Sequence, residues 1–263
     1  MMQPSAALPL HRGLTPDPVR ESRRRLHRLF LSPSRIGIVF QPILDLEDET
    51  PVGVEALARF ASDEVSIPRW LQGAQAAGIG TELEVLLARM ALAKLPELPP
   101  DLFLSVNISP QTLVSAAFSA CIGENDIERV VFEITEHTPF PEARILASQM
   151  AHIHDRGGRI ALDDVGSGFT SIRHVLALAP ELIKLDRTLV ELAEHESRHR
   201  AMVRALCSFA HETGAAIVAE GVETRQQLGV LRGLRVALGQ GYLWGRPGPL
   251  PRKSGQAVTR AGP

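Results

Sequence analysis

Acidic and amide side chains recur in the sequence directly after short apolar runs. In VEALARF (54–60), Val54 suits a buried strand, but Glu55 follows it with a carboxylate. A single carboxylate in such a position commonly caps a helix or pairs with an arginine. The pattern returns at six further apolar runs, whose polar residues are Asn107, Glu133, Asp163 with Asp164, Lys184, Glu220 and Gln240. This repetition points to one shared site.

The donor types suit hard divalent cations. Carboxylates that meet at one place repel one another, so several stay protonated at neutral pH unless cations neutralise them. Carboxylates combined with the amide oxygen of Asn107 favour Mg²⁺ or Mn²⁺ over zinc. The set is too large for a single magnesium ion that keeps its waters. Two ions that share a carboxylate fit better, and the adjacent pair Asp163 and Asp164 is the natural bridge.

A pair of metal ions points to phosphoryl chemistry. Ions roughly 3.5–4 Å apart stabilise both the attacking and the leaving oxygen of an in-line displacement, so phosphodiester hydrolysis is the leading hypothesis. Lys184 either positions the attacking water and stabilises phosphorane charge, or forms a salt bridge with Asp186 or another nearby acid. Arg59 is expected beyond its strand end, where it would bind a substrate phosphate.

Alternating elements are expected to position these residues. The β-rich runs cover 36–46, 51–60, 101–109, 129–136, 159–164, 181–186, 215–223 and 237–243, and helical stretches separate most of them. This alternation predicts an α/β fold, a (β/α)8 TIM-like barrel whose C-terminal strand ends meet at one mouth; a doubly wound open sheet is the alternative. The link EDET (47–50) is too short for a crossover helix, so one of the first two strands runs antiparallel to the rest.

Local signals place two helix starts. Ser109 followed by Pro110 offers a side-chain cap and a proline at the first helical position. Thr224 and Gln227 have the spacing of a capping box. The segment HESRH (195–199) fits the zinc-protease pattern HExxH, but its charged flanks argue against a zinc helix.

Composition excludes several classes of protein. The 263 residues are 44% hydrophobic and 22% charged, with a net charge of -2, which is typical of a globular protein and gives no strong field for a nucleic-acid polymer or an anionic membrane. No run approaches the roughly 18 apolar residues of a membrane span, and the N-terminus lacks a secretory apolar core. Cys121 and Cys207 lie far apart without metal-ligand spacing. We therefore expect free buried thiols and a cytoplasmic protein.

Three regions are expected along the chain. Residues 1–33 would be a disordered segment plus a short basic helix, which either covers one end of the domain or contacts a membrane or nucleic acid. Residues 34–250 would form the barrel, and residues 251–263 a flexible tail.

Several motifs together resemble the EAL-domain family of cyclic di-GMP phosphodiesterases. They are FQP (40–42), EALAR (55–59), NIS (107–109), EITE (133–136), DDVGSGFTS (163–171), KLD (184–186), AEGVE (219–223) and QGYLWGRP (240–247). They follow the order of the family, and the resemblance extends from about Phe40 to Pro249.

The resemblance implies a barrel with an antiparallel first strand that hydrolyses cyclic di-GMP to linear pGpG with two Mg²⁺ or Mn²⁺ ions. Its motifs assign one ion to Glu55, Asn107, Glu133 and Asp163, and the other to Asp163, Asp164 and Glu220. Lys184 would contact the catalytic water, Glu136 would brace the loop after the fifth strand, and Glu220 would be a ligand, a general base or both. The residues expected to contact substrate or line its site are Gln41, Leu57, Arg59, Asp186, Glu223, Gln240 and Pro247.

The chain departs from the family after the paired aspartates. Val165 stands where the family usually has phenylalanine, and Phe169 and Thr170 replace the usual tyrosine and serine. Because this loop is thought to couple the dimer interface to metal binding, a second function remains open: a weak or inactive sensor that binds cyclic di-GMP and acts through a protein partner. The resemblance also implies a homodimer formed by helices near strands five and six, and a possible sensory domain.

Overall fold

The computed structural model describes residues 36–60, 67–135, 141–166, 175–176 and 178–251. Eight strands in this part of the chain close into a barrel in their sequence order, so the expected barrel is confirmed and the open sheet is wrong. The strands are β1 (Ile36–Asp45), β2 (Pro51–Phe60), β3 (Phe103–Ile108), β4 (Val130–Ile134), β5 (Arg159–Val165), β6 (Leu182–Leu185), β7 (Ala216–Ala219) and β8 (Leu238–Gly239).

The first strand runs against the others, as the short link predicts. β1 pairs antiparallel with both β2 and β8, whereas the strands from β2 to β8 pair in parallel. The turn between β1 and β2 is stabilised locally, because Asp45 Oδ1 accepts the Glu47 N–H at 2.7 Å and Asp48 Oδ1 accepts the Thr50 N–H at 2.8 Å. This turn lies at the amino-terminal end of the parallel strands, opposite the mouth.

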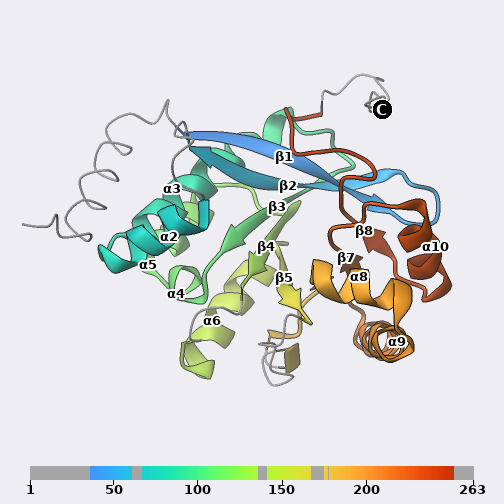
Figure 1. Cartoon of the computed structure of the whole chain (residues 1–263). Coiled ribbons are helices and arrows are strands. Elements are labelled where there is room, and N and C mark those ends of the chain that lie inside the picture. The colour runs from blue at the N-terminus through green and yellow to red at the C-terminus, as the bar shows by residue number, and fades with distance from the viewer. Residues whose placement is uncertain (1–35, 61–66, 136–140, 167–174, 177, 252–263) are drawn as a thin grey trace, which may run out of the picture.

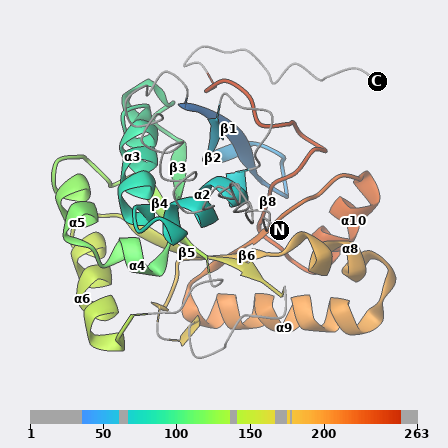
Figure 2. The same cartoon turned by 60° about the vertical axis from the view of Figure 1, so that its left-hand side comes forward.

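Helices surround the strands (Figures 1 and 2). α3, α5 and α6 lie on one side of the barrel, and α8, α9 and α10 lie on the other. The helices are α2 (Ile67–Ala76), α3 (Gly80–Leu92), the 3-10 helix η2 (Leu95–Glu97), α4 (Pro110–Leu113), α5 (Ala116–Gly123), α6 (Ala143–His154), α8 (Arg187–His195), α9 (Ser197–Thr213) and α10 (Arg225–Gly233).

The two expected helix starts are confirmed. Ser109 accepts the Thr112 N–H with its side chain and is followed by Pro110 at the start of α4. Thr224 and Gln227 form a reciprocal capping box at the start of α10. Both caps satisfy backbone donors that a helix leaves unpaired in its first turn.

An apolar layer fills the barrel below the mouth. Its residues, here called the apolar floor, are Ile43, Phe103, Val131, Ala161, Leu182 and Val218. Gly53 gives the Phe103 ring its space, since a methyl group at Gly53 would lie 2.5 Å from that ring. The interior is therefore a packed core rather than a pore.

The outward side chains of the strands pack beneath the helices. Leu104, Ile160 and Ile183 are buried there, and the Phe132 ring meets Phe118 of α5 edge-on at 5.1 Å between centroids. Burial on both faces explains why these strands read as continuous apolar runs. It also means that a polar side chain on the inner face stands out against the pattern.

Some expected boundaries and exposures are wrong. β7 and β8 are shorter than the runs 215–223 and 237–243, and Arg59 lies inside β2 rather than beyond it. Cys121 is buried, but Cys207 is only half-buried, and both are free thiols. The expected N-terminal segment at 1–33 lies outside the described residues, as does almost all of the expected tail.

Candidate active site

Polar residues form the inward layer directly above the apolar floor. Side chains two positions apart in a strand lie on the same face, so the residue two positions after each apolar-floor residue also points into the barrel, closer to the mouth. On five strands that next residue is polar: Phe103 is followed by Ser105, Val131 by Glu133, Ala161 by Asp163, Leu182 by Lys184 and Val218 by Glu220. Scattered positions in the sequence thus meet at one end of the barrel.

Lys184 lies among the acids of this layer and is 2% exposed. Its Nζ lies 2.6 Å from Glu220 Oε1, 2.7 Å from Glu133 Oε2, 3.2 Å from Asp163 Oδ1 and 3.8 Å from Glu55 Oε2. Burial lowers the pKa of Lys184, but the four carboxylates outweigh it, so the pKa is raised well above its ordinary value. Lys184 therefore carries a positive charge, and its ion pairs run to neighbouring acids.

Both oxygens of Glu133 are engaged. Ser105 Oγ donates to Oε1 at 2.5 Å, and Lys184 Nζ donates to Oε2 at 2.7 Å. Burial and the charges of nearby acids, Glu55 foremost, raise the pKa of Glu133 well above its ordinary value although Lys184 opposes them. A nearby cation would reverse this preference for the protonated form.

Glu55 has the opposite balance. Burial raises the pKa of Glu55. The charge of Lys184 and the hydrogen bonds from Gln240 and Asn107 lower it by more than burial raises it, so the net pKa lies below the ordinary value. Asn107 Nδ2 donates to Oε1 at 2.7 Å, and Gln240 Nε2 donates to Oε2 at 2.7 Å. Glu55 is thus held as a carboxylate in a fixed orientation.

A bulge brings Asp163 and Asp164 to the mouth together. The β5–β6 register shifts between Leu162 and Val165, so both aspartates stand opposite Lys184 alone. Asp164 takes a left-handed backbone conformation, with φ 58. In a regular strand, adjacent side chains point to opposite faces; a bulge is the device that re-aims one of them.

The acids fit a divalent cation. One carboxylate oxygen each from Asp163, Asp164 and Glu220 can lie within 4.8 Å of one another. Burial raises the pKa of Glu220 to about 8, and the charges of Asp163 and Glu55 add to the effect while Lys184 opposes it. Among the described residues, Asp163 Oδ1 is buried without a hydrogen bond, although it lies near Lys184. A hard oxygen-ligated ion would satisfy that oxygen and offset the repulsion.

Other expected site residues lie around this cluster. Gln41 is buried; it receives a hydrogen bond from Gln240 at 3.1 Å and donates to the Gly245 carbonyl at 3.2 Å. Leu57 and Arg59 share the β2 face of Glu55 and are partly exposed, with Arg59 donating to the Ala58 carbonyl.

The remaining expected residues are less tightly connected to the cluster. Asp186 caps α8 by accepting the Thr188 N–H at 2.9 Å. Glu223 is exposed and pairs with Arg187 at 3.2 Å. Pro247 is half-buried in the segment after β8, and Glu136 lies outside the described residues.

Two buried polar residues were missed by the motif-based reasoning. Ser105 orients Glu133, and its position two residues before Asn107 on the same strand face was the available signal. Glu84 of α3 accepts the Ser109 N–H at 2.9 Å and so fixes the turn that follows Asn107. No pattern in the sequence distinguishes Glu84 from Glu82, the exposed acid of the same helix.

The HExxH pattern has no zinc-helix geometry. α8 ends at His195, Glu196 is extended, and α9 begins at Ser197, so the two histidines lie on different helices. His199 Nδ1 lies 3.0 Å from Glu196. The expectation against zinc chemistry agrees with this break between the helices.

The family follows from comparison with known sequences. A sequence model of the EAL domain matches residues 23–247. The chain belongs to the EAL domain family. The resemblance inferred from the separate motifs is therefore confirmed over most of the chain.

This EAL domain is similar to longer curated proteins. It is 31% identical over 245 residues to an uncharacterised signalling protein of Caulobacter vibrioides, with 89% of the chain and 30% of that protein covered. It is 27% identical over 239 residues to the cyclic di-GMP phosphodiesterase PdeL of Escherichia coli K12, with 84% of the chain and 65% of PdeL covered. The chain thus spans less than two thirds of either relative.

Solved EAL structures share the fold of this EAL domain. The EAL enzyme Bd1971, bound to cAMP and cyclic di-GMP, aligns with a TM-score of 0.80 at 22% identity, covering 89% of this chain and 67% of that one. YkuI of Bacillus subtilis, in complex with substrate cyclic di-GMP and calcium, aligns with a TM-score of 0.73 at 24% identity, covering 86% and 60%. Across the described residues, every helix is too short or too polar to cross a bilayer.

Proposed function

We propose that this protein is a metal-dependent phosphodiesterase that hydrolyses cyclic di-GMP to linear pGpG. Membership of the EAL family and the similarity to PdeL support the substrate. The observation that carries the proposal is the cluster at the mouth, where Asp163, Asp164 and Glu220 converge beside a buried lysine. Such a cluster of carboxylates destabilises the folded protein by charge repulsion unless bound cations neutralise it.

The proposed ligands fall into two groups that share Asp163. Glu55, Asn107, Glu133 and Asp163 would hold one Mg²⁺ or Mn²⁺ ion, and Asp163, Asp164 and Glu220 would hold the other. When bound, such a pair supplies a nucleophilic hydroxide and stabilises the charge of an in-line displacement. The bulge in β5 supports this assignment, because it gives one strand two neighbouring carboxylates at the mouth.

The protein's own side chains would orient the reactants. Lys184, held as an ammonium by four acids, would hold the attacking water and offset charge that develops on the phosphate. Glu220 would act as a ligand, and as a general base if it is also within reach of the attacking water; it already lies 2.6 Å from Lys184 Nζ. Glu136, which lies outside the described residues, would brace the loop after the fifth strand.

The nucleotide would lie over the mouth, against residues that range from the buried Gln41 and Gln240 to the exposed Glu223. The proposed contacts are Gln41, Leu57, Arg59, Asp186, Glu223, Gln240 and Pro247. Arg59 is suited to a phosphate oxygen because a guanidinium recognises phosphate with paired N–H donors. Glu223, paired with Arg187, would act at the rim.

The direct test is incubation of the purified protein with cyclic di-GMP and Mg²⁺ or Mn²⁺, followed by chromatography for pGpG. We expect pGpG to form with either ion and to disappear with EDTA. Glu55→Ala should abolish cleavage because it removes an expected ligand and the acceptor of two hydrogen bonds. Glu82→Ala is the matched control, since Glu82 is exposed on α3.

Full activity of Glu55→Ala would show that the metal assignment is wrong. Binding of cyclic di-GMP without formation of pGpG would instead favour the sensor, the function suggested by the altered residues after Asp164. Within that loop, Val165 is buried in β5, whereas Phe169 and Thr170 lie outside the described residues.

The proposed assembly is a homodimer formed near strands five and six. α6 and α9, which flank these strands, expose the apolar side chains of Ile145 and Met202. Size-exclusion chromatography with light scattering would measure the mass directly. A monomeric mass at micromolar concentration would contradict the proposed dimer and leave the proposed chemistry unaffected.

A further inference from the structure

Glu49 adopts an unusual backbone conformation in the turn between β1 and β2. Its φ is 60, in the left-handed region that disfavours residues with a Cβ. A glycine would take this conformation without strain, so the position carries a cost that the Glu49 side chain must offset.

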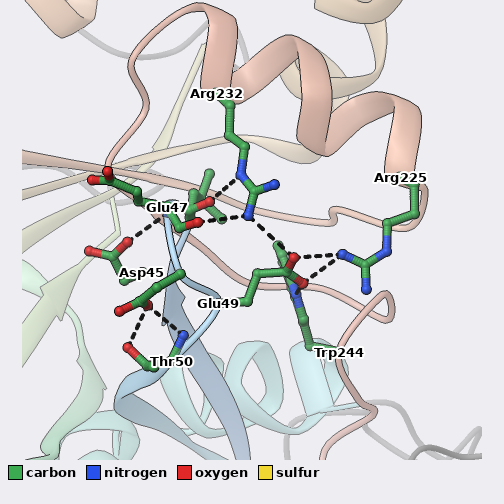
Figure 3. Close-up of polar contacts among 9 residues, drawn as sticks. Asp45, Glu47, Glu49, Thr50, Arg225, Arg232 and Trp244 are labelled. Carbon is green, nitrogen blue, oxygen red and sulfur yellow. Dashed lines mark hydrogen bonds and ion pairs between the residues drawn. The ribbon is translucent and has the colours of Figure 1, made fainter.

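The Glu49 carboxylate gathers three side chains from distant parts of the chain (Figure 3). Arg225 Nη1 donates to both Glu49 oxygens, at 2.7 and 2.6 Å, and Arg232 Nη2 donates to Oε1 at 3.2 Å. Trp244 Nε1 donates to Oε2 at 2.9 Å. The hydrogen bond from Trp244 lowers the pKa of Glu49 most, and the hydrogen bond from Arg225 lowers it next. The pKa lies below its ordinary value, so Glu49 is charged. We call Glu49, Arg225, Arg232 and Trp244 the clasp.

The clasp lies where the barrel is weakly paired. β1 and β8 align at only two positions, Leu44 with Gly239 and Asp45 with Leu238. Trp244 packs over this short contact, since a methyl group at Gly239 would lie 3.2 Å from the Trp244 ring. The clasp therefore adds side-chain contacts at the β1–β8 contact, where few backbone hydrogen bonds join the strands.

The segment held by Trp244 leads into the mouth. Residues 240–250, here called the strap, pass from β8 back to β1, where Gly248 and Phe40 exchange two backbone hydrogen bonds of 2.7 and 2.9 Å. The carbonyl of Gly245, next to Trp244, accepts the Gln41 amide. Gln240, at the start of the strap, donates to both Gln41 and Glu55.

We propose that Glu49 is a remote positioning residue for nucleotide binding, because the clasp fixes the strap and the strap orients Gln41 and Gln240. The consequence for turnover rests on the proposed function. Its effect belongs mainly to KM, because Gln41 and Gln240 are proposed nucleotide contacts, and a smaller effect on kcat follows from the hydrogen bond that Gln240 donates to Glu55.

Two variants test the clasp from opposite sides. Glu49→Gly removes the carboxylate while relieving the left-handed strain, and Trp244→Phe removes one N–H while keeping an aromatic ring. We expect each to raise the KM for cyclic di-GMP several-fold, with a smaller fall in kcat through the Gln240–Glu55 hydrogen bond. Glu47→Gln is the control, because Glu47 is an exposed acid in the same turn. It should leave both constants unchanged.

Hydrogen–deuterium exchange gives a readout that needs no turnover. We expect faster exchange at the Gly248 amide, and at the Leu243 amide that donates to the Val222 carbonyl, in both clasp variants. The double variant should resemble Glu49→Gly, because Glu49→Gly already removes the acceptor of the Trp244 N–H. Unchanged KM and unchanged exchange in the strap would overturn the proposal, as would destabilisation spread evenly over the barrel. If the unaltered protein does not cleave cyclic di-GMP, the proposed function fails and exchange still decides the clasp.

Discussion

At the scale of single residues, the site depends on which oxygen atoms are already satisfied. Glu133 receives Ser105 on one oxygen and Lys184 on the other, whereas Asp163 keeps a buried oxygen near Lys184 without a hydrogen bond. Ser105 therefore fixes which oxygen of Glu133 faces the lysine and the other acids.

Replacing Ser105 should reveal this role. Ser105→Ala leaves Glu133 Oε1 buried without its donor, which should cost about 1–3 kcal/mol of unfolding free energy. Urea denaturation in EDTA would measure the cost, and calorimetry with Mn²⁺ should detect weaker ion binding. Ser208→Ala, at an exposed position of α9, is the control. Equal stability of the two variants would contradict the importance of the Ser105 hydrogen bond.

The sequence predicts many site residues because the acids interrupt apolar runs. Ser105 escaped because a serine within a strand is unremarkable until the inward face is known. The convergence of Asp163 and Asp164 could not be derived from strand periodicity, which places neighbours on opposite faces. It depends on the bulge and on the left-handed Asp164, both of which are tertiary features.

At the scale of elements, α3 fixes the turn that follows Asn107 at the end of β3. Glu84 accepts the Ser109 N–H, and one helical turn away Thr81 receives a hydrogen bond from Thr112 at 3.3 Å. Two contacts spaced three residues apart on both helices set the register of α4 against α3. The end of β3 is thereby held in place.

Glu84 is suited to a substitution test. Glu84→Leu should lower the unfolding free energy by about 1–3 kcal/mol, because the buried Ser109 N–H loses its acceptor. Glu84→Gln retains an acceptor oxygen and should recover much of the loss. Thermal denaturation would measure both variants beside Glu82→Leu, at an exposed position of the same helix. A Glu84→Leu protein as stable as this control would show that the contact is dispensable.

The sequence predicts which strands and helices form better than it predicts their lengths. The short link predicted the antiparallel β1, because no helix fits in it. The brevity of β8 was not predictable, since the apolar letters of 237–243 continue past Gly239. The strap leaves the sheet there and takes its hydrogen bonds from Val222 and Phe40 instead.

At the scale of the whole molecule, the barrel gathers negative charge at one end. The net charge of -2 conceals this, because basic residues are spread over the remainder of the chain. Folding brings the acids together, and among the described residues Lys184 is the cation that forms ion pairs with them. Ion binding and folding should therefore be linked.

This linkage predicts stabilisation by metal. Mn²⁺ should raise the Tm relative to EDTA, and a free concentration a hundredfold above Kd would add about 2.7 kcal/mol for one site. Differential scanning calorimetry would measure the shift. Asp163→Asn should reduce it because Asp163 is the carboxylate shared by both proposed ions. The same Tm in Mn²⁺ and EDTA would contradict the cation site.

The apolar floor also limits how ligands can enter and leave the barrel. Phe103, Val131 and Leu182 fill the barrel below the acids, so a ligand would reach the acids from the mouth. In the proposed reaction, pGpG would leave by the mouth through which the next cyclic di-GMP molecule binds, and the two would compete for the same site. Added pGpG should therefore behave as a purely competitive inhibitor in initial-rate measurements.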